Sequence, residues 1–213
     1  ATIVVEVPFQ SCIGQQRLLL KGVEREVKLA PSVKKVFVRL PKPSLEDVKS
    51  DADRLLEALE SQIGRRLKID YEALKRTPLS IREGGWAVTA VVWMNRELIS
   101  VRTREDAKGM YGFAVDIGTT KLAAYLLNLE TGKIVATVSD MNPQIPYGED
   151  VISRISYTTV GEGNLEKLHN VIIDGINKLI DEACGKAGIT KEDIYLSLIH
   201  ISEPTRLGMI SYA

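Results

Sequence analysis

Residues 112–135, GFAVDIGTTKLAAYLLNLETGKIV, constrain the fold of this chain most, because an apolar run is broken by a short polar stretch and then resumes. Three extended runs, YGFAVDIG, KLAAYLLNL and KIVATVSD, are separated by residues 118–120 and 130–132. Extended runs joined by short glycine-bearing turns are typical of an antiparallel β-meander. The pattern therefore predicts three strands, with Asp116 at the carboxyl end of the first, buried strand.

The first turn of this meander carries side chains that suit phosphate. Gly118 allows the backbone to approach an anion closely, and Thr119 and Thr120 supply hydroxyl and amide donors. Lys121 adds a positive charge. Asp116 would not bind phosphate itself, but a carboxylate beside a polyphosphate suits Mg²⁺, which prefers oxygen ligands and keeps several waters. The alternative is an ordinary hairpin with Asx-turn chemistry, and spacing alone favours neither interpretation.

Composition excludes several classes of function. The chain has 213 residues, 45% of them apolar, with 28 basic and 28 acidic side chains. A net charge of zero gives no general attraction to nucleic acid or to an anionic membrane. No apolar run is long enough to span a membrane, and the start ATIVVEVPFQ lacks the basic region of a signal peptide. We expect a soluble cytoplasmic protein with reduced thiols at Cys12 and Cys184.

The length and the pattern together predict two domains. Residues 1–30 form an expected connecting segment, 31–106 a small α+β domain and 110–195 a second domain that opens with the meander. Within the small domain, a weak second helix is expected to be interrupted at Pro78. WAVTAVVWM and ELISVRT then predict a hairpin that turns through Asn95-Arg96.

The first helix of the small domain has a clear apolar stripe. Ser44 is its expected N-cap, and the helix runs to about Ile63. Leu45 and Val48 begin a series of apolar residues at spacings of three and four. Such a stripe predicts a helix that packs one face against a sheet.

The stretch SDMNPQIPYGEDVISRISYT, which follows the meander, carries turn signals and then a helix start. Asn142, Gln144, Asp150 and Arg154 are its polar residues expected near a cleft. Arg154 would contact phosphate, or it would pair with Asp150 one turn away. An exposed helical pair of that kind is worth only about 0.2 to 0.5 kcal/mol. The residues themselves leave both possibilities open.

Two motifs carry a resemblance to known proteins. FAVDIGTTKLAAYLLNLETGKIV resembles the first phosphate motif of the superfamily of acetate and sugar kinases, heat-shock chaperones and actins. The stretch with NPQ, GED and SRI resembles the NPQxxxGxDVxSRI segment of the ATP-dependent reductive activators of corrinoid proteins. This resemblance covers 1–195 in the family's order. It implies an α+β, α/β architecture: a small α+β middle domain followed by the first part of an actin-like, ribonuclease H-like ATPase lobe.

The resemblance also implies an activity. Such an activator returns the Co(II) corrinoid of a corrinoid iron-sulfur protein to Co(I), using ATP, Mg²⁺ and an electron from an attached 2Fe–2S domain that this chain does not include. By this likeness Asp116 serves catalysis and the metal. The residues of the nucleotide site would be Gly118, Thr119, Thr120, Lys121, Asn142, Gln144, Asp150 and Arg154. A homodimer is also implied, and the 213-residue chain alone is expected to be inactive. The alternatives are a small-molecule kinase and a non-enzymatic nucleotide switch.

The last residues have a different character. A long amphipathic helix is predicted at 164–188, with His169 on its surface. After it, LSLIHISEPTRLGMISYA, at 196–213, lacks helical period and clean alternation. It resembles a transposase-type sequencing adapter translated in frame. We therefore expect the natural sequence to stop near Tyr195 and the remainder to lie outside the fold.

Overall fold

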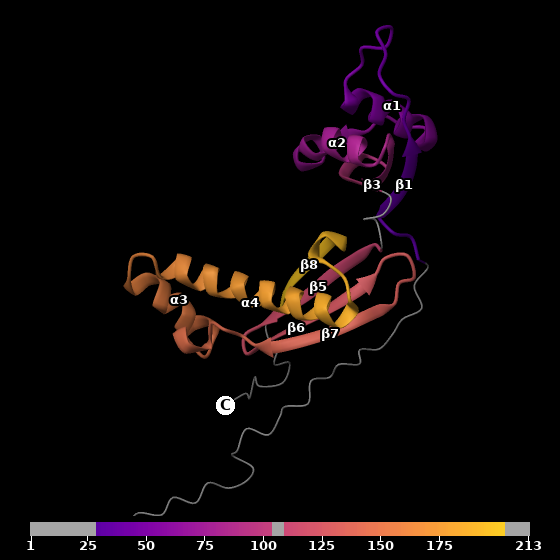
Figure 1. The fold of residues 1–213 in the computed structure, drawn as a ribbon. Helices are drawn as coiled ribbons and strands as arrows, with labels where there is room; N and C mark the ends of the chain where they lie inside the picture. The colour runs from indigo at the N-terminus through magenta and orange to yellow at the C-terminus, as the bar shows by residue number, and fades with distance from the viewer. Residues whose placement is uncertain (1–28, 104–108, 203–213) are drawn as a thin grey trace, which may run out of the picture.

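The computed structural model describes residues 29–103 and 109–202, which form two units of mixed α and β structure (Figure 1). We call 29–103 the first unit and 109–202 the second unit. The first unit contains β1 (Val33–Arg39), α1 (Asp51–Ile63), β2 (Lys68–Ile69), α2 (Tyr71–Glu83), β3 (Ala87–Trp93) and β4 (Glu97–Thr103). The second contains β5 (Tyr111–Gly118), β6 (Lys121–Asn128), β7 (Ile134–Met141), α3 (Val151–Val160), α4 (Asn164–Ala187) and β8 (Ile194–Ser202). The predicted α+β class is confirmed, because the described residues hold two four-stranded sheets and four α-helices.

The first unit is a sheet with its two helices packed on one face. Its strand order is β1-β3-β4-β2, antiparallel except between β2 and β4. Leu55 and Leu59 of α1 and Ile81 of α2 lie fully buried against the strands. The predicted hairpin is present, and its three-residue turn, 94–96, contains the expected Asn95 and Arg96. Met94 and Asn95 adopt φ angles of 50° and 53° there.

The first helix begins later than the sequence pattern predicts. Its N-cap is Ser50, whose Oγ accepts a hydrogen bond from the Asp53 amide at 3.1 Å, so Ser44 is not the cap. Leu45 and Val48, expected in the apolar stripe, lie outside the helix and are 100% and 89% exposed. Both serines are followed by acidic residues, so local capping chemistry could not separate them.

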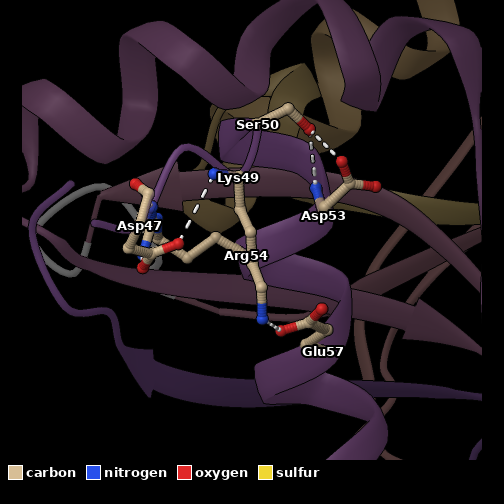
Figure 2. Close-up of polar contacts among 6 residues, drawn as sticks. All are labelled: Asp47, Lys49, Ser50, Asp53, Arg54 and Glu57. Carbon is tan, nitrogen blue, oxygen red and sulfur yellow. Dashed lines mark hydrogen bonds and ion pairs between the residues drawn. The ribbon is translucent and has the colours of Figure 1, made fainter. Parts of the chain in front are cut away.

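A tertiary contact explains why the helix starts at Ser50 (Figure 2). The buried guanidinium of Arg54 pairs with the Asp47 carboxylate, and its Nη2 donates to the Asp47 carbonyl at 3.3 Å. Lys49 reaches forward to Glu57, with Nζ 2.6 Å from Oε2. These contacts hold the segment before α1 in a non-helical path, because a buried cation requires a partner.

The second helix is continuous, whereas an interruption was expected. It runs unbroken across Pro78, where the sequence predicted an interruption. Pro78 lacks an N–H, so the Leu74 carbonyl loses its helical partner. Leu74 is 42% exposed, so this part of α2 faces water, where an unpaired carbonyl is solvated. The exposed position therefore accounts for a proline inside a helix of 13 residues.

The second unit opens with the predicted meander. β5, β6 and β7 are antiparallel neighbours, and Ile117 lies opposite Leu122 next to the first turn. α4 packs on this sheet, where Leu122, Leu126 and Leu179 are fully buried. Its predicted C-terminal stop is confirmed, because Gly188 adopts the left-handed conformation at φ 66°. Within the described ranges, no helix combines the length and apolar character needed to cross a membrane.

β8 lies beside β5 at the edge of the second sheet. The two strands are parallel, from Tyr111 opposite Ile194 to Gly118 opposite Ser202. The expected end of the fold near Tyr195 is therefore exceeded by seven strand residues. LSLIHIS is largely apolar and contains neither glycine nor proline, so it can extend along an available strand edge. An adapter origin for 196–213 stays a prediction, and 203–213 lie outside the described residues, as do Cys12 and nearly all of 1–30.

The two units meet through a buried ion pair and a small apolar cluster. Arg102 of β4 donates from Nη1 to Asp193 Oδ1 at 2.8 Å, to the Tyr195 hydroxyl at 3.1 Å and to the Glu192 carbonyl at 3.1 Å. Only 4% of the Asp193 side chain is exposed. Burial raises the pKa of the Tyr195 phenol, although the Arg102 guanidinium acts to lower it. The cluster contains Val33, Val91, Met110, Ile99, Leu129 and Tyr195.

Candidate functional site

The turn between β5 and β6 is a tight hairpin with Thr119 and Thr120 between the strands. We call residues 118–120 the hairpin tip. Asp116 lies two residues before the tip, and 47% of its side chain is exposed. Its Oδ1 is 2.9 Å from Nδ1 of His200. His200 belongs to the segment expected to derive from an adapter, so we assign it no part in the site.

Three consecutive carbonyl groups of the hairpin tip accept hydrogen bonds from one neighbouring segment. Asn142 donates from Nδ2 to the Gly118 carbonyl at 2.8 Å and from its backbone amide to the Thr120 carbonyl at 2.8 Å. Arg154 donates from Nη2 to the Thr119 carbonyl at 2.5 Å. Asn142 is 1% exposed and Arg154 9% exposed, so these bonds are shielded from water.

The guanidinium of Arg154 is directed at backbone and amide oxygens. Besides the Thr119 carbonyl, it donates from Nε to the Gly148 carbonyl at 2.9 Å and from Nη1 to Gln144 Oε1 at 3.4 Å. Gly148 has no room for a side chain, because a Cβ there would lie 2.7 Å from the Arg154 nitrogen. The sequence left open a phosphate contact and a pair with Asp150, and the structure adds this third set of partners.

Asp150 serves the start of α3. Its Oδ1 accepts from the Ser153 amide at 2.7 Å, as an N-cap does. The Ser153 hydrogen bonds hold the pKa of the Asp150 carboxyl below its usual value, and the charge of Arg154 adds a smaller contribution in the same direction.

Gln144 connects the hairpin tip to α4. Its backbone amide donates to Asn142 Oδ1 at 2.9 Å, and its Nε2 donates to the Leu168 carbonyl at 3.1 Å. Together with the Arg154 contact, these bonds join the tip, the segment after β7 and the long helix. A side-chain network of this kind makes each member's position depend on the others.

A cavity of about 450 Å³ lies between the hairpin tip, α3 and α4. Five of the expected site residues line this cavity, and they are Gly118, Thr119, Asn142, Gln144 and Arg154. The other four lie outside its lining, and they are Asp116, Thr120, Lys121 and Asp150. The remaining apolar and hydroxyl wall residues were not assigned to a site from the sequence, and they are Ile117, Val151, Ile155, Thr158, Leu165, Leu168, Ile172 and Ile201. Helical spacing of apolar residues in α3 and α4 was the available signal, but it indicates core packing equally well.

His169 was expected on the surface of α4. The structure shows it exposed, and it also lines the cavity.

The donor set suits magnesium bound together with phosphate. Among the described residues, no group of three or more His, Cys, Asp or Glu side chains is placed to hold a metal by itself. Asp116 offers a half-exposed carboxylate close to the tip. One carboxylate, several waters and phosphate oxygens are a common ligand set for Mg²⁺. The residues therefore fit a metal that arrives with a nucleotide.

Comparison with known proteins identifies both units. A family model described as the RACo linker region matches residues 22–108, and one described as the RACo middle region matches 111–201. The family's middle region is thus the segment that contains the hairpin. Its linker region includes residues 31–106, the small domain that the resemblance had implied to be a middle domain.

Two individual proteins extend the likeness. The chain is 36% identical over 127 residues to the corrinoid activation enzyme RamQ of Eubacterium limosum. This matched stretch covers 59% of this chain and 21% of that protein. A solved structure of a reductive activator for corrinoid, iron-sulfur protein matches with 31% identity and a TM-score of 0.69, over 85% of this chain and 29% of that one. The chain thus spans less than a third of the length of either relative.

Proposed function

The chain belongs to the RACo family, whose linker and middle regions it carries, and from this membership we propose that it is part of a reductive activator of a corrinoid protein. In the proposed reaction, one electron reduces the partner's Co(II) corrinoid to Co(I), with ATP hydrolysis coupled to the transfer. We propose that an attached 2Fe–2S domain supplies the electron and that the nucleotide-binding unit includes residues 110–195. The short share of each relative that the chain covers supports a longer protein.

The observation that carries the proposal is the hairpin tip with the half-exposed Asp116 two residues before it, within a segment matched by the family model. The tip suits the terminal phosphates of ATP, and Asp116 suits their Mg²⁺. When bound, ATP supplies the free energy that makes an unfavourable reduction possible. Coupling requires that the nucleotide states of the activator bind the two redox states of the partner differently. The chain's contribution is to hold and orient the phosphates.

Several parts of this proposal extend beyond the chain. A homodimer, a cytoplasmic location, and inactivity of the 213-residue chain alone are proposals of the same kind. Lys121 and Thr120 are proposed to act at the outer side of the tip, since they lie outside the cavity lining.

The proposal is tested with Asp116→Asn in a complete activator that carries this chain. The substitution keeps the size of the side chain and removes its charge. We expect Mg²⁺-dependent ATP affinity to fall by about tenfold or more, the range found when groups that orient a metal are lost. The rate of Co(I) formation, monitored by the absorbance of Co(I), should fall together with the ATP affinity. Asp174→Asn on the exposed side of α4 is the matched control. Unchanged ATP binding and Co(I) formation in Asp116→Asn would refute the proposed role of the hairpin.

A further inference from the structure

Arg154 and Asn142 make contacts that differ from those of phosphate ligands. A phosphate ligand directs its donors toward open space where the anion lies. Here Nε, Nη1 and Nη2 of Arg154 each have an acceptor in the protein, and Nδ2 of Asn142 has the Gly118 carbonyl. Both side chains are more than nine-tenths buried. Four donors of the two side chains thus bind protein oxygens, and three of these oxygens are backbone carbonyls.

The three anchored carbonyls determine the orientation of the peptide groups at the tip. No cis peptide bond occurs among the described residues, so each carbonyl lies opposite the N–H of the next residue. Anchoring the carbonyls of residues 118–120 on one side consequently directs the amides of 119–121 to the other side. Successive amides with a common direction form the kind of concave surface that binds anions. A rotated peptide group would instead present its carbonyl oxygen to the phosphate and repel it.

The anchors are themselves held in place. The Gly148 carbonyl and Gln144 Oε1 fix the plane of the Arg154 guanidinium, and Gln144 is in turn bonded to the Leu168 carbonyl of α4. The close approach of Gly148 to the Arg154 backbone excludes any larger residue there. A planar guanidinium with several fixed partners keeps one orientation, which a flexible ammonium does not.

We propose that Asn142 and Arg154 are positioning residues that hold the hairpin tip in its anion-binding conformation without contacting the phosphate. This inference rests on the proposed function of the tip and assigns these two residues a role within it. According to this inference, the two residues control the conformation that the tip has before any nucleotide is present.

The decisive variant is Asn142→Asp, because it is nearly isosteric and exchanges one atom's role. The introduced carboxylate would retain the acceptor for the Gln144 amide and lose the donor to the Gly118 carbonyl. Asn128→Asp is the matched control, since the Asn128 Oδ1 acts as an acceptor for the amides of Glu130 and Thr131. Arg154→Lys is the second variant, because it keeps the charge and loses the fork of donors.

The first measurement is 15N relaxation of the backbone amides of residues 118–121 by NMR in the nucleotide-free 213-residue chain. Asn142→Asp and Arg154→Lys should lower the order parameters at the tip from about 0.85, typical of rigid backbone, to below about 0.6, typical of flexible backbone. The strands on either side and the Asn128→Asp control should keep their order parameters. Unchanged order parameters at the tip in both folded variants would overturn the inference. If one variant fails to fold, the other decides the question.

The second measurement is ATP·Mg²⁺ binding to the complete activator as salt is varied. A positioning role predicts weaker binding for Arg154→Gln with the same dependence of log Kd on log salt, since the lost charge made no phosphate contact. Equally weak binding with a shallower salt dependence would identify Arg154 as a ligand and overturn the inference. Failure of the unmodified activator to bind ATP would instead refute the proposed function, and the relaxation measurement would still decide the conformational role.

Discussion

The junction between the two units supports a quantitative prediction for Arg102→Met. The Arg102 side chain is 18% exposed and that of Asp193 is 4% exposed, with Nη1 and Oδ1 at 2.8 Å. Methionine fills much of the same space but leaves the Asp193 carboxylate without its cation. The apolar cluster beside the pair is retained, so the substitution isolates the electrostatic contact.

The magnitude follows from what remains around Asp193. Removing one partner of a fully buried ion pair costs about 3 to 5 kcal/mol. Oδ2 of Asp193 still accepts from the Thr190 amide at 3.2 Å and from the Thr190 hydroxyl at 3.1 Å. Because these bonds persist and Arg102 is partly solvated, we expect a loss of about 2 to 3 kcal/mol in the free energy of unfolding. For a chain of this size the loss corresponds to about 4 to 12 °C in Tm.

Urea unfolding followed by two probes tests the value. Both tryptophans, Trp86 and Trp93, lie in the first unit, so their fluorescence reports on that unit, whereas circular dichroism is also sensitive to α4. Arg82→Met is the control, because Arg82 pairs with Asp51 at 2.5 Å with 56% of its side chain exposed. Exposed pairs contribute about 0 to 1 kcal/mol. Equal losses for the two variants would refute the claim that burial makes the Arg102 pair important.

Three further substitutions give opposite or pH-dependent outcomes. Asp150→Ala should lower the urea midpoint at neutral pH, because the α3 cap is lost. The folded pKa of Asp150 lies below its unfolded value, so the wild type loses this advantage as acid protonates the carboxyl. The urea midpoints of the two proteins should therefore converge below the usual carboxyl pKa of about 4. Gly148→Ala should destabilise by about 1 to 3 kcal/mol, since its Cβ would lie 2.7 Å from a backbone nitrogen. Gly185→Ala, inside α4 with nothing within 4 Å of the new Cβ, should stabilise by about 0.5 to 1 kcal/mol. Thermal unfolding of the pair checks both signs, and a midpoint for Gly148→Ala at or above that of Gly185→Ala would contradict them.

The meander and its hairpin could be predicted because their signals are local. Apolar runs separated by Gly118 and Gly132 determine strands and turns within a few residues. The long helix ending at Gly188 was predictable for the same reason, since a glycine in the left-handed conformation ends a helix where its period stops. Local chemistry was sufficient wherever a single interpretation satisfied it.

The start of α1 depended on a side-chain pair seven residues apart, which capping rules do not consider, and the path of β8 depended on a distant strand edge. Ser44 and Ser50 have similar capping potential, and the Arg54 pair with Asp47 decides between them. For β8, alternation was a poor guide, because an apolar segment beside β5 pairs along its whole length regardless of pattern.

The candidate site shows the same division. The proposed phosphate-binding role of Gly118 and Thr119 could be suggested from turn chemistry together with the family resemblance. The actual partners of Asn142 and Arg154 lie 24 and 35 positions away, at the Gly118 and Thr119 carbonyls. A polar residue near a cleft has many possible partners at such separations, so the sequence could place both residues near the site without identifying their contacts.

The distance along the chain between the hairpin tip and its anchors has a consequence for biosynthesis. A hairpin such as β5–β6 closes within microseconds of leaving the ribosome, and translation then adds about 5 to 20 residues each second. Arg154 therefore emerges seconds after the hairpin that it holds, since it follows Thr119 by 35 positions. During that interval the hairpin is only marginally stable, because it lacks the packing of α4 and its tip lacks the contacts of Arg154. Under the proposed function, bound nucleotide would therefore stabilise this unit only after the segment through Arg154 has docked.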